Sequence, residues 1–144
     1  MTGRAWIKKR RTAPPGKGRL MDRAQLERFI AEKYGAAAEY LWQRYPNYMI
    51  FRHGDNRKWF AAVMDISQRK LGLAEDKIID VLNVKCDPVL IGSLRGDKGF
   101  FPAYHMSKDS WLTVAQDVSV DEDKIIWLLD MSFRLTAKRQ PKKA

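Results

Sequence analysis

Two apolar segments separated by a short polar turn constrain the fold of this chain more than any other feature. Residues 48–53 and 58–66 are rich in apolar and aromatic side chains, and the residues between them read Gly54-Asp55-Asn56-Arg57. Aromatic and β-branched side chains favour strands, while Gly, Asp and Asn favour the tight turns that join neighbouring strands. The pattern predicts a β-hairpin, and with it an antiparallel sheet.

Capping, charge and apolar residues predict a first helix at about 22–34 and a last helix at about 121–138. Asp22 is a good N-cap, and the apolar residues after it recur on one helical face. The last helix begins with three acidic residues, which suit the positive end of its dipole, and it is apolar around most of its circumference. Such a helix is either buried on more than one side or offers a face to a second copy of the chain.

A third strand is expected at 77–86. Because side chains alternate along a strand, Leu82, Val84 and Cys86 would share one face, and Val81, Asn83 and Lys85 the other, more solvated one. Asp87-Pro88 then begins a short helix to about Arg95, since Asp caps helices and Pro fits the first helical position. We also expect a turn or short helical piece at 67–72, a loop at 96–102, and short extended pieces at 103–106 and 112–116. This order predicts an α+β fold: an antiparallel sheet with helices packed on one face.

The 144 residues amount to about one domain, which we predict at 21–139. The net charge of +10 belongs mainly to the ends of the chain, because residues 1–20 carry +7, residues 134–144 carry +5 and residues 21–133 carry −2. Residues 1–20 have few apolar positions and no periodicity, which predicts a disordered basic extension from an upstream start or from cloning. Residues 140–144 are expected to form a basic tail. The pI of about 9.9 therefore says little about a binding face on the domain.

The sequence also bears on location. No apolar run approaches the roughly 20 residues that a membrane-spanning helix needs, and no apolar stretch follows the basic N-terminal segment as in a secretory signal. The lone Cys86 cannot form an internal disulfide, which suits a reducing compartment. We expect a cytoplasmic protein that does not bind membranes.

Motifs of catalysis and metal binding are scarce. Cys86, His105 and His53 are too few for a zinc site, so we expect no metal and no cofactor. Ser67 and Lys70 match the Ser-x-x-Lys of serine acylases, but the companion motifs are absent, as are phosphate-binding and dinucleotide-binding loops. We therefore expect no enzymatic activity.

Basic and aromatic residues gather between residues 83 and 114. Cations beside aromatic side chains are the usual means by which proteins contact phosphates and stack on bases. The same pattern also fits aromatic core residues with solvated lysines around them, and the residues alone leave both interpretations open. The set is Lys85, Arg95, Lys98, Phe100, Phe101, Tyr104, His105, Lys108 and Trp111.

Four segments carry a family resemblance. NVKCDP at 83–88, GFFPAYHMSKDSW at 99–111 and DMSFRLTAK at 130–138, with YPNYMIFRHGDNRKWFAAVMD upstream, resemble the MmcQ/YjbR family of small bacterial proteins over roughly residues 22–139. The resemblance implies a frataxin-like α+β fold, described as a double-wing motif, and DNA binding.

The chain departs from the family pattern at two positions. Ser107 stands where Asn is common and Ser110 where His is common, which weakens any paired-histidine site. The likeness to frataxin does not imply iron binding, because that activity needs a carboxylate cluster on the first helix. Here the acids of that helix alternate with basic residues.

Two hypotheses follow. The leading one is a non-enzymatic DNA-binding protein that contacts phosphates through Lys85, Arg95, Lys98 and Lys108, with His105 alongside. The alternative is a small-ligand or protein-interaction module with an aromatic pocket lined by Trp59, Tyr104, His105 and Trp111. In either case the protein is a monomer or a homodimer formed through the last helix.

Overall fold

The predicted hairpin is present in the computed structural model, which describes residues 21–117 and 120–138. The predicted extension at 1–20 and tail at 140–144 lie outside the described residues. The elements, in chain order, are α2 (Arg23–Tyr34), β1 (Met49–Arg52), β2 (Trp59–Ser67), the short 3-10 helix η1 (Gln68–Leu71), β3 (Ile78–Lys85), α3 (Pro88–Leu94), β4 (Phe100–Pro102), β5 (Trp111–Ala115) and α4 (Glu122–Thr136).

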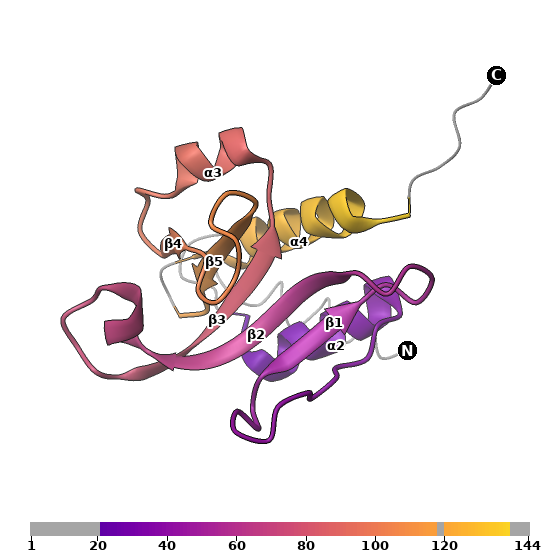
Figure 1. Ribbon diagram of the computed structural model, residues 1–144, viewed down its shortest axis with the longest axis horizontal. Coiled ribbons are helices and arrows are strands. Elements are labelled where there is room, and N and C mark those ends of the chain that lie inside the picture. The colour runs from indigo at the N-terminus through magenta and orange to yellow at the C-terminus, as the bar shows by residue number, and fades with distance from the viewer. Residues whose placement is uncertain (1–20, 118–119, 139–144) are drawn as a thin grey trace, which may run out of the picture.

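The strands form one five-stranded antiparallel sheet in the order β1-β2-β3-β5-β4 (Figure 1). The predicted loop at 96–102 is present only at 96–99, and the prediction of an extended piece at 103–106 was wrong. Phe100–Pro102 is the edge strand β4, with Phe101 opposite Thr113 of β5, and the residues after it turn away from the sheet. Pro102 fits there because an edge strand has one side on which no N–H is required.

Strand alternation divides the core between the two faces of the sheet. On the face that we call the helix face, α2 and α4 pack against large strand residues such as Phe51, Leu82 and Leu112, and in Figure 1 these helices lie behind the sheet. The opposite face, which we call the open face, carries a smaller cluster: Tyr48, Met64, Ile66, Ile79, Val81 and Ala115. The predicted α+β fold with helices packed on one face is confirmed.

The open face of β3 is less solvated than predicted. Val81 and Asn83 are fully buried, and only Lys85 at the end of the strand is partly exposed. Val81 belongs to the open-face cluster, and Asn83 is hydrogen-bonded to Tyr104 in the turn that follows β4. The expected solvation was wrong because a turn distant in sequence covers the middle of this strand.

The predicted caps Asp22 and Asp87 are confirmed, and Asp121 caps α4 in the same way. The carboxylates of Asp22, Asp87 and Asp121 each accept a hydrogen bond at 2.9 Å from a backbone N–H in the first turn of α2, α3 and α4. Gln25 also accepts from the Asp22 N–H, which completes a capping box at α2. An N-cap of this kind contributes about 0.5–2 kcal/mol to stability.

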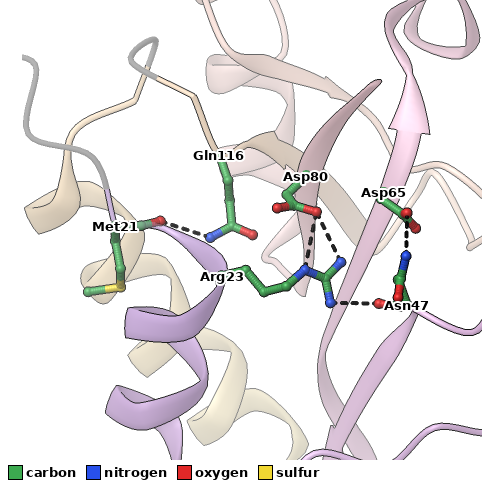
Figure 2. Close-up of polar contacts among 6 residues, drawn as sticks. All are labelled: Met21, Arg23, Asn47, Asp65, Asp80 and Gln116. Carbon is green, nitrogen blue, oxygen red and sulfur yellow. Dashed lines mark hydrogen bonds and ion pairs between the residues drawn. The ribbon is translucent and has the colours of Figure 1, made fainter. Parts of the chain in front are cut away.

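Polar contacts hold the start of α2 against the sheet (Figure 2). The Arg23 guanidinium donates to Asp80 on β3 at 3.0 Å and to the backbone oxygen of Asn47 at 2.6 Å. Figure 2 also shows Asn47 donating to Asp65 and Gln116 donating to the Met21 backbone oxygen. Residues from the start of α2, from β2 and β3, and from the segments before β1 and after β5 therefore meet at one corner of the helix face.

The helix α4 is buried on one side only. Ile125, Leu128 and Leu129 are fully buried, whereas Trp127 and Leu135 are exposed. The Ser132 hydroxyl donates to the Phe60 backbone oxygen at 2.5 Å, and the Lys85 backbone N–H donates to Ser132 at 2.9 Å, so α4 is tied to β2 and β3. Within the described ranges, no helix has the length and apolar character needed to cross a membrane.

Candidate binding site on the open face of the sheet

One end of the open face carries a row of aromatic and basic side chains. Lys85, the last residue of β3, pairs in register with Trp111 on β5, and its Nζ lies 5.8 Å from the Trp111 ring centroid. On the other side of β3, Trp59 begins β2 at the same end of the sheet, where Ala61 pairs with Val84. Three predicted site residues, Trp59, Lys85 and Trp111, are thus brought together from three neighbouring strands.

A buried polar clamp fixes the turn at 103–106 over this face. Asn83 donates to the Tyr104 backbone oxygen at 2.8 Å, the Tyr104 N–H donates to Thr113 at 2.9 Å, and the Thr113 hydroxyl donates to Asn83 at 2.5 Å. The turn holds His105 at φ 63°, a left-handed conformation uncommon outside glycine, with its ring centroid 4.0 Å from that of Tyr104. Asn83 and Thr113 therefore position His105 rather than contacting a ligand themselves.

Next to the turn lies a pocket of about 330 Å³, which we call the aromatic pocket. Its lining combines rings, thioethers and small apolar groups from β1, β2 and the segments before β1 and after β4. Of the predicted aromatic set, Trp59 and His105 line it, whereas Tyr104 lines a neighbouring hollow and Trp111 lies beside Lys85. The lining residues are Trp42, Tyr45, Tyr48, Ile50, Trp59, Ala62, Met64, His105 and Met106.

The rings of the pocket contact one another mostly edge to face. Trp42 lies 5.9 Å from Trp59 at 87° and 5.9 Å from Tyr48 at 78°, while Tyr45 and Tyr48 are stacked at 4.7 Å. Burial is the main cause that raises the pKa of Tyr48 to about 12, so its hydroxyl stays protonated as a hydrogen-bond donor near neutral pH.

Three further residues that line the pocket, Trp42, Tyr45 and Tyr48, were not predicted from the sequence. The available signal was the aromatic run at 40–48, which reads YLWQRYPNY. The run itself does not show which of its aromatic side chains lie in the core and which line a pocket. Only the folded chain brings this segment against β2 and the turn at 103–106.

The predicted phosphate-contacting residues divide into two groups. The Arg95 guanidinium donates to the Lys108 backbone oxygen at 3.0 Å, and the turn that carries Lys108 is bonded to the end of β3, where the Cys86 N–H donates to Ser110 O at 2.9 Å. Lys85, Arg95 and Lys108 therefore approach the same end of the sheet. Lys98 is exposed in the loop before β4. This loop lines a separate hollow of about 540 Å³, and Arg95 lines the same hollow.

The other chemically distinctive residues have structural roles. His53 is buried and hydrogen-bonded to Thr136 at 2.8 Å, and burial raises the pKa of the Cys86 thiol, which lies in the main core. Ser67 caps η1 by accepting from the Arg69 N–H. In the part of the chain that the structure describes, no three or more His, Cys, Asp or Glu residues are grouped as metal ligands would be.

Two comparisons identify relatives of this chain. It is 37% identical over 117 residues to the uncharacterised protein YyaQ of Bacillus subtilis, a match that covers 81% of this chain and 99% of YyaQ. It is also similar to the crystal structure of a Pseudomonas syringae protein, with 41% identity and a TM-score of 0.79 over 81% of this chain and all of that one. No family model matches the chain.

A more distant structure shares the fold. The crystal structure of a Deinococcus radiodurans protein with a DUF419 domain is 21% identical, with a TM-score of 0.64 over 86% of this chain and 84% of that one. The level of identity to YyaQ over nearly its whole length establishes a common family. The chain belongs to the YyaQ family of α+β proteins and has the fold of the DUF419 domain.

Proposed function

We propose that this protein binds DNA without catalysing a reaction, and that Lys85, Arg95 and Lys108 contact phosphates. The observation that carries the proposal is that the segments bearing these three cations meet at one end of the sheet: the end of β3, the end of α3 and the turn before β5. Cationic side chains that approach a backbone from fixed elements set its position on the protein surface.

The state of these charges supports the proposal. Among the described residues, Lys85, Lys98 and Lys108 form no ion pair, whereas cations such as Arg23, Lys33 and Arg52 are paired with carboxylates. Unpaired cations can exchange counterions for phosphates. Because residues 21–133 are nearly neutral, the expected binding is modest and strongly salt-dependent.

The family supports the proposal independently. We infer that the YyaQ family is the MmcQ/YjbR family that the sequence resembles, since the NVKCDP segment joins β3 to α3 and GFFPAYHMSKDSW runs from β4 to β5 in the observed fold. The DNA-binding role ascribed to that family agrees with a basic and aromatic open face.

The test distinguishes DNA binding by the open face from DNA binding by the basic residues at 1–20. Lys85→Gln with Lys108→Gln is compared with the matched pair Lys70→Gln with Lys77→Gln, which lies near the opposite end of β2 and β3. We expect the first pair, and not the second, to weaken binding of a random-sequence duplex. It should also reduce the slope of log affinity against log salt by about 0.9 for each phosphate that the variant no longer neutralises.

A chain that begins at Met21 completes the experiment, because it lacks the seven basic residues of 1–20. We expect it to bind the duplex at low salt more weakly than the full chain but with the same dependence on Lys85 and Lys108. If the shortened chain does not bind and the double substitution in the full chain has no effect, the extension alone binds DNA and the proposal is wrong.

A further inference from the structure

The aromatic pocket is more apolar and more exposed than packing requires. Trp42 is 37% exposed and Tyr45 is 45% exposed, and the adjacent Tyr40 and Leu41 are also in contact with water. Contiguous exposed apolar surface of this kind marks binding sites more often than ordinary surface does. The fold gains little from leaving these rings in water, so a ligand is the simpler reason for their placement.

We propose that the aromatic pocket holds one unstacked base of a single DNA strand. The inference rests on the proposed function, because the base belongs to the DNA that Lys85 and Lys108 contact. It adds the class of DNA, a single strand or an unpaired position, and the residues that receive the base.

Ring geometry favours a flat aromatic occupant over an aliphatic one. Trp42 meets Trp59 and Tyr48 nearly at right angles, so among the described residues neither Trp42 nor Trp59 has a ring stacked on its face. Met64 and Met106 complete the wall with thioethers, which adapt their shape and make favourable contacts with ring edges. A base between such walls gains the stacking that it loses on leaving a strand.

The polar groups of the residues that line the pocket favour a heterocycle over a plain hydrocarbon ring. Within the described residues, the Tyr48 hydroxyl, the His105 ring nitrogens and the indole N–H groups of Trp42 and Trp59 form no hydrogen bond. These groups are mostly donors, and bases present carbonyl oxygens and ring nitrogens as acceptors. The left-handed turn at His105, held by Asn83 and Thr113, keeps one of these polar groups at the pocket wall.

Size and position point to a base within a strand. A volume of about 330 Å³ is near the lower end for ligand pockets, which suits one ring system and excludes a stacked base pair. Trp59 lies at the same end of the same face as Lys85, so a strand whose base enters the pocket can place a phosphate beside that lysine. A duplex keeps its bases stacked and offers none to the pocket.

The test compares two exposed tryptophans in the full chain. Trp42→Leu removes a pocket wall, and Trp127→Leu removes a tryptophan of similar exposure on α4, outside the pocket. Anisotropy of a fluorescent oligothymidylate measures single-strand affinity, and a duplex and an abasic strand are measured in parallel. Because base stacking on one aromatic residue is sizeable, we expect Trp42→Leu to weaken oligothymidylate binding about 5- to 150-fold. Duplex and abasic binding should be unchanged by it, and Trp127→Leu should change none of the three.

The possible failures are distinguishable. If Trp42→Leu leaves single-strand affinity unchanged while Lys85→Gln with Lys108→Gln weakens it, the base does not enter the pocket, and the proposed function stands. If no form of DNA binds, both proposals are wrong. If free thymidine binds in a Trp42-dependent way and strands do not, the pocket belongs to a small-ligand module, and a base within a strand is excluded as its occupant.

Discussion

The two faces of the sheet both carry large aromatic residues, but these residues have different roles on each face. On the helix face, Phe51, Phe60 and Leu129 are completely buried beneath or within α2 and α4. On the open face, Trp42 and Trp59 remain partly exposed, and a polar clamp rather than a helix covers the strands. The difference indicates that one face holds the fold together, while the other presents rings and cations to the outside.

The largest expected effect tests the helix face. Phe51→Ala removes a fully buried ring, and we expect it to lower the free energy of unfolding by about 3–5 kcal/mol, because transfer free energy is lost and a cavity remains. Trp42→Leu on the open face should lower it by less than about 1 kcal/mol. Urea denaturation of both variants measures the contrast. Equal decreases would show that the open face belongs to the core as fully as the helix face does.

An intermediate effect is expected at the clamp. Thr113→Val keeps the shape of the side chain but leaves the Tyr104 N–H and the Asn83 amide oxygen without their partner. We expect stability to fall by about 1–3 kcal/mol, the cost of a buried polar group left unpaired. The amide resonances of Tyr104 and His105 should shift and broaden. If the turn is unchanged and stability is retained, the hydrogen bonds of Thr113 are not what holds the turn at 103–106 over the open face.

The smallest effect concerns the edge of the helix face, where Asp130 on α4 accepts hydrogen bonds from Tyr34 and Lys33 of α2. Burial raises the pKa of Asp130, but these hydrogen bonds and the charges of Lys33 and Arg134 outweigh it and leave the pKa below its ordinary value. A carboxylate with a lowered pKa stabilises the fold above its unfolded pKa, and this contribution is lost as pH falls through the folded pKa.

We therefore expect wild-type stability to fall on acidification below about pH 4, near the ordinary pKa of Asp. Asp130→Asn should make this decline shallower and should lower stability at neutral pH by less than about 1 kcal/mol, since the ion pair is partly exposed. Urea midpoints across pH measure both changes. An identical acid profile in the variant would mean that other carboxylates, such as Glu39 beside Arg52, account for the acid response.

The elements that were predicted correctly are those that depend on interactions between residues close together in the sequence. The 54–57 turn, the Asp87-Pro88 helix start and the acidic start of the last helix are local chemistry, and each is present. The strand at 100–102 was missed because an edge strand is defined by its partner, here β5. Its own sequence, Phe-Phe-Pro, does not distinguish a short strand from a loop.

The candidate site was predictable only in part. The cluster at 83–114 supplied Lys85, His105 and Trp111, since unusual residues at close spacing are visible in one dimension. The different roles of the residues in this cluster could not be predicted. Asn83 is part of the buried clamp, and Trp111 lies beside Lys85 and does not line the aromatic pocket. Trp42 and Tyr45 enter the pocket from a segment about 60 residues before His105, and only chain folding makes that contact.

By itself, the sequence determined the helix caps, the hairpin and the fold class, because hydrogen bonds and side-chain periodicity act over a few residues. Only the tertiary structure decided which turn covers the open face of β3, where the basic segments meet and which rings surround the pocket. These depend on strand register and on which distant loop covers a strand, and a one-residue change in register would exchange every side chain between the two faces.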